Sequence, residues 1–325
     1  MRKAILLCDS AANIERVYAR GRLERLDEVC DLRRGIVNGD RLLADAGRFD
    51  DVEVVFGTWG LPVLGSAVLD ALPSLQAVFY AAGSVKGRVE KALECGVRVF
   101  SAWQANAVPV AEFSLSQILL SNKDFFRNAR ECSDSHEGRT TARRQCRGNF
   151  GAEVLILGAG AIGTKLIELL RPFHVRVRVW DPFLRSETAV DLGVEKEEDL
   201  RSGFEHADVV SNHLANVRET WGLLREEHFR VMRDGAVFIN TGRGRTVDEP
   251  GLCRVLADRA DLTALLDVTY PEPPEPDSPL YALPNVFLTS HIAGSLGAEV
   301  VRMADFMIEE YERFIAGEPL RYEVT

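Results

Sequence analysis

Short apolar runs alternate with amphipathic segments along most of the chain. In the first third, the apolar runs are typical of buried strands, and segments with helical periodicity separate them. The strands expected there are 3–8, 53–56, 77–80 and 97–100, and the first helical segment is 12–26. None of the turns carries the glycines of a nucleotide site, so this pattern predicts an open α/β sheet with another role.

The alternation resumes after residue 150 and predicts a second, larger sheet. The expected strands are 153–157, 175–180, 207–211, 236–240, 263–267 and 286–289. Helical segments separate them, which is the pattern of a doubly wound parallel sheet. A long helical pattern covers 105–130, with Pro109 tolerated in its first turn. A last amphipathic helix, which ends at Gly317, follows the final strand and is free to pack on the first domain.

The stretch 153–182 contains the parts of a dinucleotide-binding βαβ unit in order. A strand is followed by Gly158, Gly160 and Gly163, then by a helix and a second strand that ends at Asp181. These glycines permit a tight turn, close approach of a pyrophosphate, and close packing of helix on strand. Asp181 would accept hydrogen bonds from a ribose hydroxyl, which favours NAD over NADP, although Arg185 leaves that preference open.

Two other interpretations of the glycine motif remain open at this point. A glycine-rich turn occurs without any ligand, and methyltransferases combine a similar turn with an acidic ribose-binding residue. The cofactor class must therefore be decided by residues elsewhere in the chain.

The predicted fold class is α/β, with two Rossmann-like doubly wound parallel-sheet domains and a cleft between them. The 325 residues suit two domains of roughly 100–200 residues each. We expect a discontinuous, flavodoxin-like substrate-binding domain from 1–103 plus 295–325. An NAD-binding Rossmann domain is expected from 104–294.

Composition and charge narrow the classes of partner. The net charge of −10 provides no basic field for nucleic acid or an anionic membrane. The basic segment Arg139, Arg143, Arg144 and Arg147 is more typical of a solvated loop. No apolar stretch is long enough to span a membrane, and the six scattered cysteines show no metal-binding spacing. We therefore expect a cytoplasmic protein with reduced thiols and no metal site.

Three polar side chains come directly after expected strands of the second sheet. They are Arg243, Glu272 and His291. Ligands of open α/β sheets bind beyond the carboxyl ends of the strands, so these residues would share one crevice with the glycine turn. Taken one by one, each has an ordinary alternative, respectively a capping residue, a solvated side chain and a buried histidine.

Together, the three residues describe a carbonyl–alcohol redox site. Arg243 can bind a substrate carboxylate and polarise the adjacent carbonyl. His291 can give a proton to the carbonyl oxygen or remove it in the reverse direction, because imidazole titrates near neutral pH. Glu272 would orient the imidazole and stabilise its charged form.

Beyond these residues, the chain resembles the D-isomer-specific 2-hydroxyacid dehydrogenases, which include phosphoglycerate, glyoxylate/hydroxypyruvate and D-lactate dehydrogenases. The resemblance covers most of the chain in order and spacing. Its pieces are VPVAEFSLSQILL at 108–120, LILGAGAIG at 155–163, VWDP at 179–182, HLANVRETWGLL at 213–224, FINTGRGRTVDEPGL at 238–252, the segment 265–294 that ends in TSHIAG, and the final helix.

The resemblance implies an NAD-dependent oxidoreductase that interconverts a 2-oxo acid and a D-2-hydroxy acid. Arg243, Glu272 and His291 would be its catalytic residues. The cofactor-binding residues would be Gly158, Gly160, Ala161, Ile162, Gly163, Asp181, His213, Leu214, Thr241, Gly242, Asp267 and Gly294. It also implies a homodimer, formed by the helix from Ala105 and the segment 139–150. An alternative is a nonenzymatic NAD(H)-sensing protein of the corepressor type.

The substrate loop departs from the family pattern. Family members carry a GxGxD-like turn after the strand that corresponds to 77–80, whereas this chain reads AAGSVKGRVE. The backbone N–H groups of Ala82, Gly83, Ser84 and Val85 are still expected to bind a carboxylate, together with Arg243. Trp59 is a further candidate for the substrate site, and Trp59 and Trp103 are equally compatible with the core. Ala215 and the pair Thr289–Ser290 also differ from the family residues.

Overall fold

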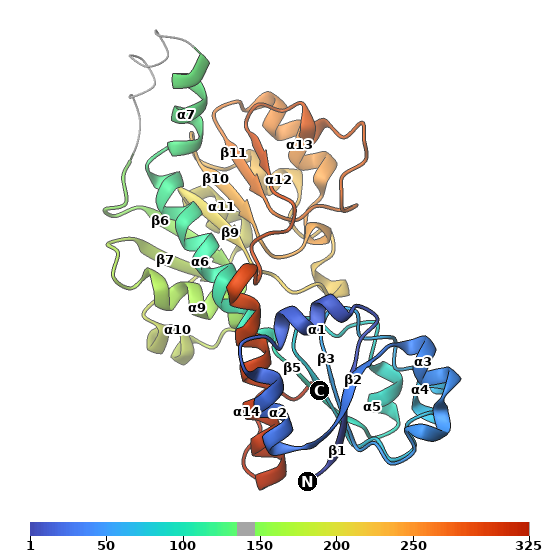
Figure 1. The fold of residues 1–325 in the computed structure, drawn as a ribbon. Coiled ribbons are helices and arrows are strands. Elements are labelled where there is room, and N and C mark those ends of the chain that lie inside the picture. Colours follow the sequence, from blue (N-terminus) through green and yellow to red (C-terminus); the bar gives the residue numbers. More distant parts are fainter. Residues whose placement is uncertain (135–146, 325) are drawn as a thin grey trace. The chain divides into compact units, whose positions relative to one another are not determined.

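The computed structural model describes residues 1–134 and 147–324, and the chain divides into two compact units. Unit 1 contains Met1–Asn106 and Ser295–Thr325, and unit 2 contains Ala107–Gly294. Each unit is built on one parallel sheet with helices packed against it (Figure 1). The predicted fold class, two parallel-sheet α/β domains, is confirmed.

Unit 1 has a five-stranded parallel sheet in the order β2-β1-β3-β4-β5. The strands are β1 (Lys3–Leu7), β2 (Asp31–Val37), β3 (Val54–Gly57), β4 (Ala77–Tyr80) and β5 (Arg98–Ser101). The helices are α1 (Ala11–Val17), α2 (Arg22–Val29), α3 (Gly39–Ala44), α4 (Ser66–Asp70), α5 (Glu90–Glu94) and α14 (Val301–Ala316). Side chains of β3 and β4 are buried throughout, as expected for strands covered on both faces.

Two features of unit 1 differ from the sequence-based prediction. Strand β2 was not predicted, because its sequence DLRRGIV is polar and its edge position leaves most of it partly exposed. The single predicted helix 12–26 is wrong, since α1 and α2 are separate helices. The chain turns between them at Arg20 and Gly21, which both have positive φ angles of 56° and 83°.

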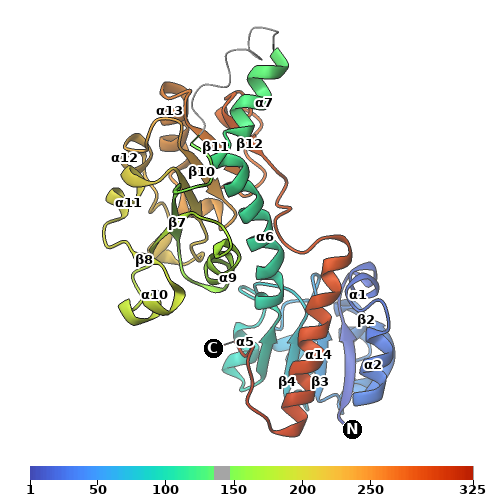
Figure 2. The same ribbon diagram turned by 90° about the vertical axis from the view of Figure 1, so that its left-hand side faces the viewer.

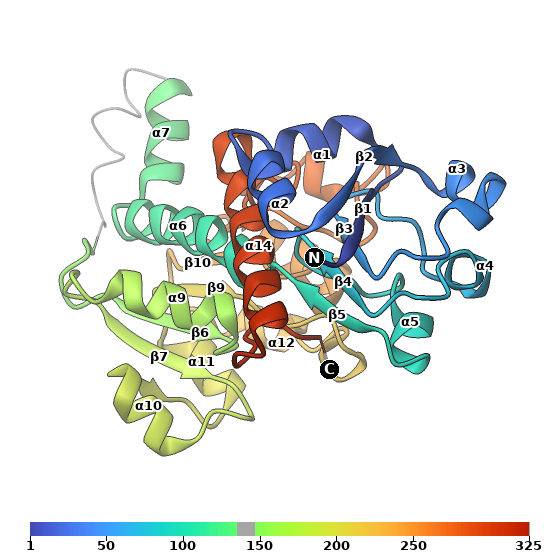
Figure 3. The ribbon, with the colours of Figure 1, turned by 60° about the horizontal axis from the view of Figure 1, so that its bottom comes forward.

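Helix α14, from the C-terminal part of the chain, completes the core of unit 1. It packs on β4 and β5 and lies beside α2 (Figure 3). Tyr311 is fully buried, with its ring edge-on to Phe56 and Phe79. The ion pairs Arg22–Asp305 and Arg25–Glu312 join α2 to α14 along their partly exposed faces.

Unit 2 has a seven-stranded parallel sheet in the order β12-β11-β10-β9-β6-β7-β8. The strands are β6 (Glu153–Leu157), β7 (Arg176–Trp180), β8 (Glu195–Lys196), β9 (Val209–Asn212), β10 (Val237–Asn240), β11 (Thr263–Leu266) and β12 (Val286–Leu288). The helices are α6 (Trp103–Asn122, which begins in unit 1), α7 (Phe125–Asp134), α9 (Ala161–Leu170), α10 (Ser186–Leu192), α11 (Leu200–His206), α12 (Glu226–Arg230) and α13 (Glu249–Asp258). The strand order reverses between β6 and β9, and such a switch point forms a ligand crevice at the carboxyl ends of the strands.

The predicted continuous helix 105–130 is wrong, because the structure breaks it into α6 and α7 (Figure 2). Asp124 between them has a positive φ of 54°, and its carboxylate pairs with Arg127 in the first turn of α7. Of the predicted basic segment, Arg147 is described and pairs with Asp208, whereas Arg139, Arg143 and Arg144 lie outside the described residues. Within the described ranges, no helix is both long enough and apolar enough to cross a bilayer.

Candidate active site

The glycine turn after β6 has the geometry that its sequence predicts. Gly158 has a positive φ of 92°, and a Cβ added there would lie 3.2 Å from the carbonyl oxygen of His213. A Cβ on Gly163 would lie 2.0 Å from the carbonyl oxygen of Gly158, so the first turn of α9 packs directly on the loop. Both positions therefore require glycine for the fold itself.

Gly160 has a different environment, which fits an approaching phosphate. It precedes α9, with an ordinary φ of −71°, and apart from its chain neighbours no heavy atom of the described residues lies within 4 Å of an added Cβ. The first N–H groups of a helix lack intrahelical acceptors, and the helix dipole favours negative charge at this end. Ala161 and Ile162 form this first turn. Open space in front of such N–H groups suits the pyrophosphate of a dinucleotide.

This contrast predicts opposite effects for two alanine substitutions. Gly163→Ala should destabilise the protein by about 2–3 kcal/mol, because its Cβ overlaps the backbone. Gly160→Ala should leave the unfolding free energy within about 1 kcal/mol of wild type but weaken NADH binding by about 10-fold. Urea unfolding and NADH fluorescence titration measure the two quantities. Unchanged NADH affinity in a folded Gly160→Ala protein would contradict a pyrophosphate at this turn.

Asp181, at the end of β7, connects two turns of the crevice. Its Oδ2 accepts a hydrogen bond of 2.7 Å from the N–H of Ala159, and its Oδ1 accepts one of 2.8 Å from the N–H of Phe183. The carboxylate is therefore held in place from both sides. Each oxygen has a second lone pair, which leaves acceptor capacity for a ribose hydroxyl.

His213, after β9, is a buried neutral histidine. Burial lowers its pKa from 6.5 to about 3. A chain of hydrogen bonds holds the ring: Ser114 donates to the carbonyl of Val110, and Thr241 Oγ1 lies 3.0 Å from Ser114 Oγ and 3.2 Å from His213 Nδ1. Since Ser114 uses its proton on Val110, Thr241 donates to Ser114 and His213 Nδ1–H donates to Thr241. His213 Nε2 then accepts from Ser211 at 2.9 Å, which fixes the tautomer.

The buried His213 predicts a loss of stability in acid. In the unfolded chain His213 is protonated below pH 6.5, whereas in the folded protein it stays neutral down to about pH 3. The free energy of unfolding is therefore unaffected by this group above pH 6.5 and falls as the pH is lowered from 6.5 to about 3. At pH 5 the wild-type free energy of unfolding should have fallen by about 2 kcal/mol from this group. His213→Gln cannot take up the proton. Urea unfolding at pH 7.5 and 5.0 should show a smaller decline for this variant, and equal declines would contradict the assignment.

Arg243 is carried by the turn that follows β10. Its guanidinium is partly buried, and Nη1 donates a 2.6 Å hydrogen bond to the carbonyl of Gly242. In residues 1–134 and 147–324 it forms no ion pair with a carboxylate. Thr246 Oγ1 donates to the carbonyl of Arg243 at 2.8 Å and Asn212 donates to that hydroxyl at 2.9 Å, so the backbone of the turn is fixed while the charge stays available.

Glu272 and His291 are in direct contact, as the sequence-based hypothesis requires. Glu272 Oε1 lies 2.6 Å from His291 Nδ1, and the two side chains are 41% and 47% exposed. The exposed pair therefore remains accessible to a substrate. His291 also has a positive φ of 58°, an uncommon conformation for a residue other than glycine, which neighbouring contacts must maintain.

Asp267 supplies those contacts, a role that the sequence did not reveal. Its buried carboxylate accepts hydrogen bonds from Thr289 Oγ1 at 2.6 Å, from the N–H of Ile292 at 2.8 Å and from the N–H of Ala293 at 2.9 Å. The N–H of His291 donates to the Asp267 carbonyl at 3.1 Å. Asp267 thus anchors the loop after β12 on both sides of His291.

The turns of Arg243 and Glu272 are also packed against each other. A Cβ added to Gly244 would lie 2.0 Å from the carbonyl carbon of Thr269, so the two backbones touch at this point. A Cβ on Gly242 would lie 3.1 Å from the carbonyl oxygen of Asn212, a looser approach, and Leu214 N–H donates to Asn212 Oδ1 at 3.2 Å. The turns after β9, β10 and β11 therefore form one interlocked rim.

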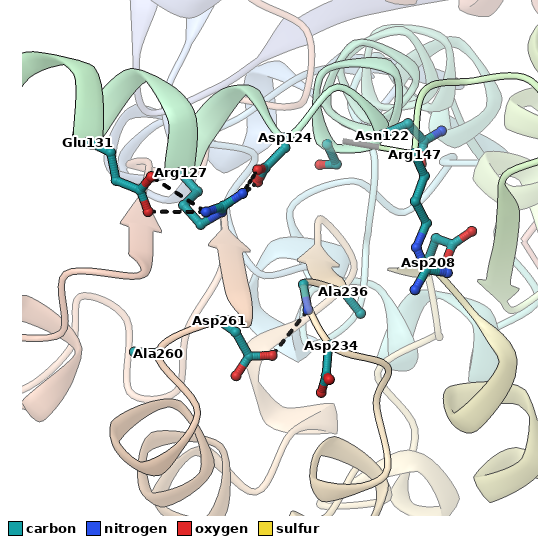
Figure 4. Close-up of a pocket in the computed structure, with 12 residues that line it drawn as sticks. Asn122, Asp124, Arg127, Glu131, Arg147, Asp208, Asp234, Ala236, Ala260 and Asp261 are labelled. Atoms are coloured by element: carbon teal, nitrogen blue, oxygen red, sulfur yellow. Dashed lines mark hydrogen bonds and ion pairs between the residues drawn. The ribbon is translucent and has the colours of Figure 1, made fainter. Parts of the chain in front are cut away.

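Two pockets of unit 2 have different positions relative to this rim. A pocket of about 460 Å³ is lined by Glu272, His291, Asp267 and Tyr281. A larger one, of about 650 Å³, lies where β9, β10 and β11 begin, at the opposite edge of the sheet (Figure 4). Its side chains largely satisfy each other, as in the pairs of Arg127 with Asp124 and of Arg147 with Asp208. The smaller pocket contains the candidate chemistry.

The predicted substrate residues other than Arg243 lie in unit 1. The loop Ala82–Val85 follows β4, and Ser101 Oγ donates to the carbonyl of Ala82 at 3.0 Å. Gly83, Ser84 and Val85 line a pocket of about 500 Å³ with Trp103. Trp59 is not among its lining residues, and its ring lies under the guanidinium of Arg16 at 5.5 Å. Ser101 could not be recognised from sequence because it acts from a neighbouring strand.

Comparisons with known proteins identify the family of the chain. A family model described as "D-isomer specific 2-hydroxyacid dehydrogenase, NAD binding domain" matches residues 115–293. The chain is 30% identical over 242 residues to a putative 2-hydroxyacid dehydrogenase, YoaD, of Bacillus subtilis, covering 72% of this chain and 65% of that one. It is 28% identical over 238 residues to a D-3-phosphoglycerate dehydrogenase of Archaeoglobus fulgidus, covering 73% and 44%.

The matched segment thus spans less than two thirds of either relative. Among solved structures, apo D-mandelate dehydrogenase of Rhodotorula graminis has the same fold, with a TM-score of 0.80 at 20% identity and coverage of 100% and 98%. The family model covers more than half of the chain. The chain belongs to the D-isomer-specific 2-hydroxyacid dehydrogenase family.

Proposed function

We propose that this protein is an NAD-dependent dehydrogenase that interconverts a 2-oxo acid and the corresponding D-2-hydroxy acid. The contact between Glu272 and His291 carries the proposal, because it creates a positioned proton donor at the carboxyl edge of a dinucleotide-binding sheet. Arg243 on the neighbouring turn, without a carboxylate partner among the described residues, supports it. A methyltransferase has no use for this combination.

The three side chains divide the work of carbonyl reduction. Arg243 binds the substrate carboxylate and donates to the carbonyl oxygen, which gains negative charge as the carbonyl carbon is reduced. His291 gives its Nε2 proton to that oxygen, producing the hydroxyl group. Glu272 accepts from Nδ1, holds the ring in one orientation and stabilises the charged imidazole before transfer. In oxidation of the hydroxy acid, each proton movement is reversed.

The cofactor would be held by the residues of the crevice, and it would supply the hydride. Gly158, Gly160 and Gly163 with the first turn of α9, Ala161 and Ile162, suit the pyrophosphate, and Asp181 suits the ribose. The turns that carry His213, Leu214, Thr241 and Gly242, the buried Asp267, and Gly294 would flank the nicotinamide. Because Asp267 anchors the loop that carries His291, Asp267 would also position the proton donor.

Asp181 should determine the choice between NADH and NADPH. A carboxylate that binds the ribose hydroxyl repels a 2′-phosphate, so the wild type should prefer NADH. Asp181→Ala should raise the KM for NADH by about 10-fold. The ratio of kcat/KM with NADH to kcat/KM with NADPH should therefore decrease. The loss of its bond to Ala159 should also loosen the turn. A ratio that stays the same in the variant would exclude Asp181 as the selecting residue.

The remaining parts of the proposal concern unit 1 and assembly. The loop Ala82–Val85 and Trp59, which follows β3, are proposed to bind the substrate in unit 1, and unit 2 is proposed to bind NAD. The N–H of Ala82 already donates to the carbonyl of Tyr80 at 2.8 Å, so the N–H groups of Gly83, Ser84 and Val85 would bind the carboxylate. A homodimer that uses α6 and the segment 139–150 is also proposed, and residues 139–146 of that segment lie outside the described residues. Sedimentation at working concentration tests it, and a monomer would remove it.

The second candidate function is a cofactor-sensing protein without turnover. The altered loop at Ala82–Val85 favours it, because a blocked substrate site would leave the cofactor site intact. Incubation with NAD and either enantiomer of several 2-hydroxy acids separates the two functions. Reduction of NAD with D enantiomers alone supports the dehydrogenase, and NADH binding without turnover of any acid supports the sensor.

A further inference from the structure

Arg245, two residues after Arg243, packs its guanidinium on two aromatic rings. Its guanidinium carbon lies 4.3 Å from the ring centroid of Trp221 and 4.2 Å from that of Tyr270. One of its nitrogens also donates a hydrogen bond to the hydroxyl of Tyr270. Both rings therefore contact the guanidinium, and the N–H groups that do not bond to Tyr270 can serve other partners. We call Arg245, Trp221 and Tyr270 the cage.

Hydrogen bonds fix this arrangement, so the cation has a defined direction. Trp221 Nε1 donates to Asn216 Oδ1 at 2.8 Å. The N–H of Gly222 donates to the carbonyl of Arg245 at 2.9 Å, which joins the segment of Trp221 to the segment of Arg245. The N–H of Tyr270 donates to Glu249 Oε2 at 3.2 Å. Ordering these side chains in advance reduces the entropy lost on binding a ligand.

The positive charge of Arg245 is not neutralised within the part of the chain that the structure describes, where it forms no ion pair with a carboxylate. The acidic residues nearest in sequence have other partners. Asp248 caps α13 through the N–H of Gly251 at 3.3 Å, and Glu249 accepts from Tyr270. Burial raises the pKa of Glu249, which weakens its tendency to carry charge. Arg243, two residues before Arg245, likewise lacks a carboxylate partner among the described residues.

The cage is built on the same turns as the catalytic residues. Arg245 follows Arg243 by two positions, Tyr270 precedes Glu272 by two positions, and the backbones of Gly244 and Thr269 touch between them. Trp221 and Tyr270 are 43% and 50% exposed, so solutes can reach the cage. Two uncompensated guanidinium groups on one rim suit a ligand that carries two negative groups.

We propose that Arg245 binds a second acidic group, a carboxylate or a phosphate, at the far end of the 2-oxo acid substrate. Arg243 would take the carboxylate next to the carbonyl, and the caged guanidinium would take the distal group through its N–H edge. The inference rests on the proposed function and names its substrate class as dianionic 2-oxo acids.

Matched substrate pairs isolate the distal charge. Oxaloacetate, 2-oxoglutarate and 2-oxoadipate each have a counterpart in which a methyl group replaces the distal carboxylate, namely 2-oxobutanoate, 2-oxopentanoate and 2-oxohexanoate. Hydroxypyruvate 3-phosphate and hydroxypyruvate form a fourth pair and separate phosphate from carboxylate. The wild type should prefer the dianion in at least one pair. No preference in any pair would overturn the inference.

Arg245→Gln should lower kcat/KM for the preferred dianion by about 10- to 100-fold and leave its monoanionic counterpart within about 3-fold. Arg254→Gln is the matched control, because Arg254 is an exposed arginine of α13 that pairs with Glu226 of α12. It should change kcat/KM for neither acid. Urea unfolding of both variants checks the fold. An equal loss of kcat/KM for both members of the pair, or no loss, would show that the cage has a structural role and does not bind the distal group.

Binding measurements separate this inference from the proposed function. Calorimetric titration of the same acids into the protein with bound NAD measures binding without turnover, because oxidised NAD has no hydride to transfer to an oxo acid. A dianion preference that disappears in Arg245→Gln would support the anion site even in a protein that never turns over. Turnover that depends on Arg243 but not on Arg245 would refute the anion site and leave the dehydrogenase intact.

Discussion

Replacing Arg243 with alanine should lower kcat/KM for 2-oxo acid reduction by about 10³-fold. The substitution removes both the partner of the substrate carboxylate and the donor to the carbonyl oxygen, where negative charge develops. The backbone of the turn should survive, because Thr246 and Asn212 hold it through the carbonyl of Arg243 rather than through its side chain. Initial rates at several substrate concentrations give the change in kcat/KM.

Two controls accompany this variant. NADH affinity should stay within about 3-fold of wild type, since the fit of the dinucleotide depends on the glycine turn and Asp181. Arg254→Ala removes an exposed arginine of the same unit and should leave kcat/KM unchanged. A rate for Arg243→Ala within 10-fold of wild type would contradict its role at the carbonyl.

Replacing His291 with asparagine should lower kcat for reduction by about 10³-fold and remove the main pH dependence. In the wild type, reduction should slow as pH rises and oxidation should accelerate, because reduction consumes the proton that His291 delivers and oxidation releases it. Asparagine is the appropriate variant, since His291 has a positive φ that asparagine tolerates better than alanine. Rates in both directions from pH 5.5 to 9 measure the effect.

Glu272→Gln provides the companion test of the same pair. Glutamine keeps the size of the side chain but removes the charge that stabilises a protonated imidazole at 2.6 Å. We expect kcat for reduction to fall by about 10- to 100-fold, less than for His291→Asn. A wild-type pH profile that persists in His291→Asn would show that another group donates the proton.

The parts of the site that could be predicted from the sequence are those set by local order along the chain. The βαβ unit of Gly158, Gly163 and Asp181 is readable because strand, turn and helix follow one another within about thirty residues. The strand ends that carry Arg243 and His291 could be expected to share one edge, because parallel strands all end there. The hydrogen bonds that hold Arg243 and His291 in place could not be predicted.

The unpredicted features depend on long-range contacts or on rare backbone conformations. Asp267 anchors His291 from a different strand, and Ser114 reaches His213 through Thr241 from a helix about 100 residues earlier in the chain. Apolar periodicity does not show which polar residue adopts a left-handed conformation, so the break at Asp124 was missed. The edge strand β2 was missed because tertiary pairing, not hydrophobicity, makes it a strand.

The decrease in NADH absorbance on addition of 2-oxo acids tests the central claim most directly. Glyoxylate, hydroxypyruvate, its 3-phosphate, pyruvate, phenylpyruvate and 2-oxoglutarate should be compared, with NADPH in parallel and Arg243→Ala as the inactive control. The account predicts NADH oxidation with at least one acid in the wild type and a loss of about 10³-fold in the variant. NADH binding without oxidation by any of these acids, or equal rates in both proteins, would contradict it.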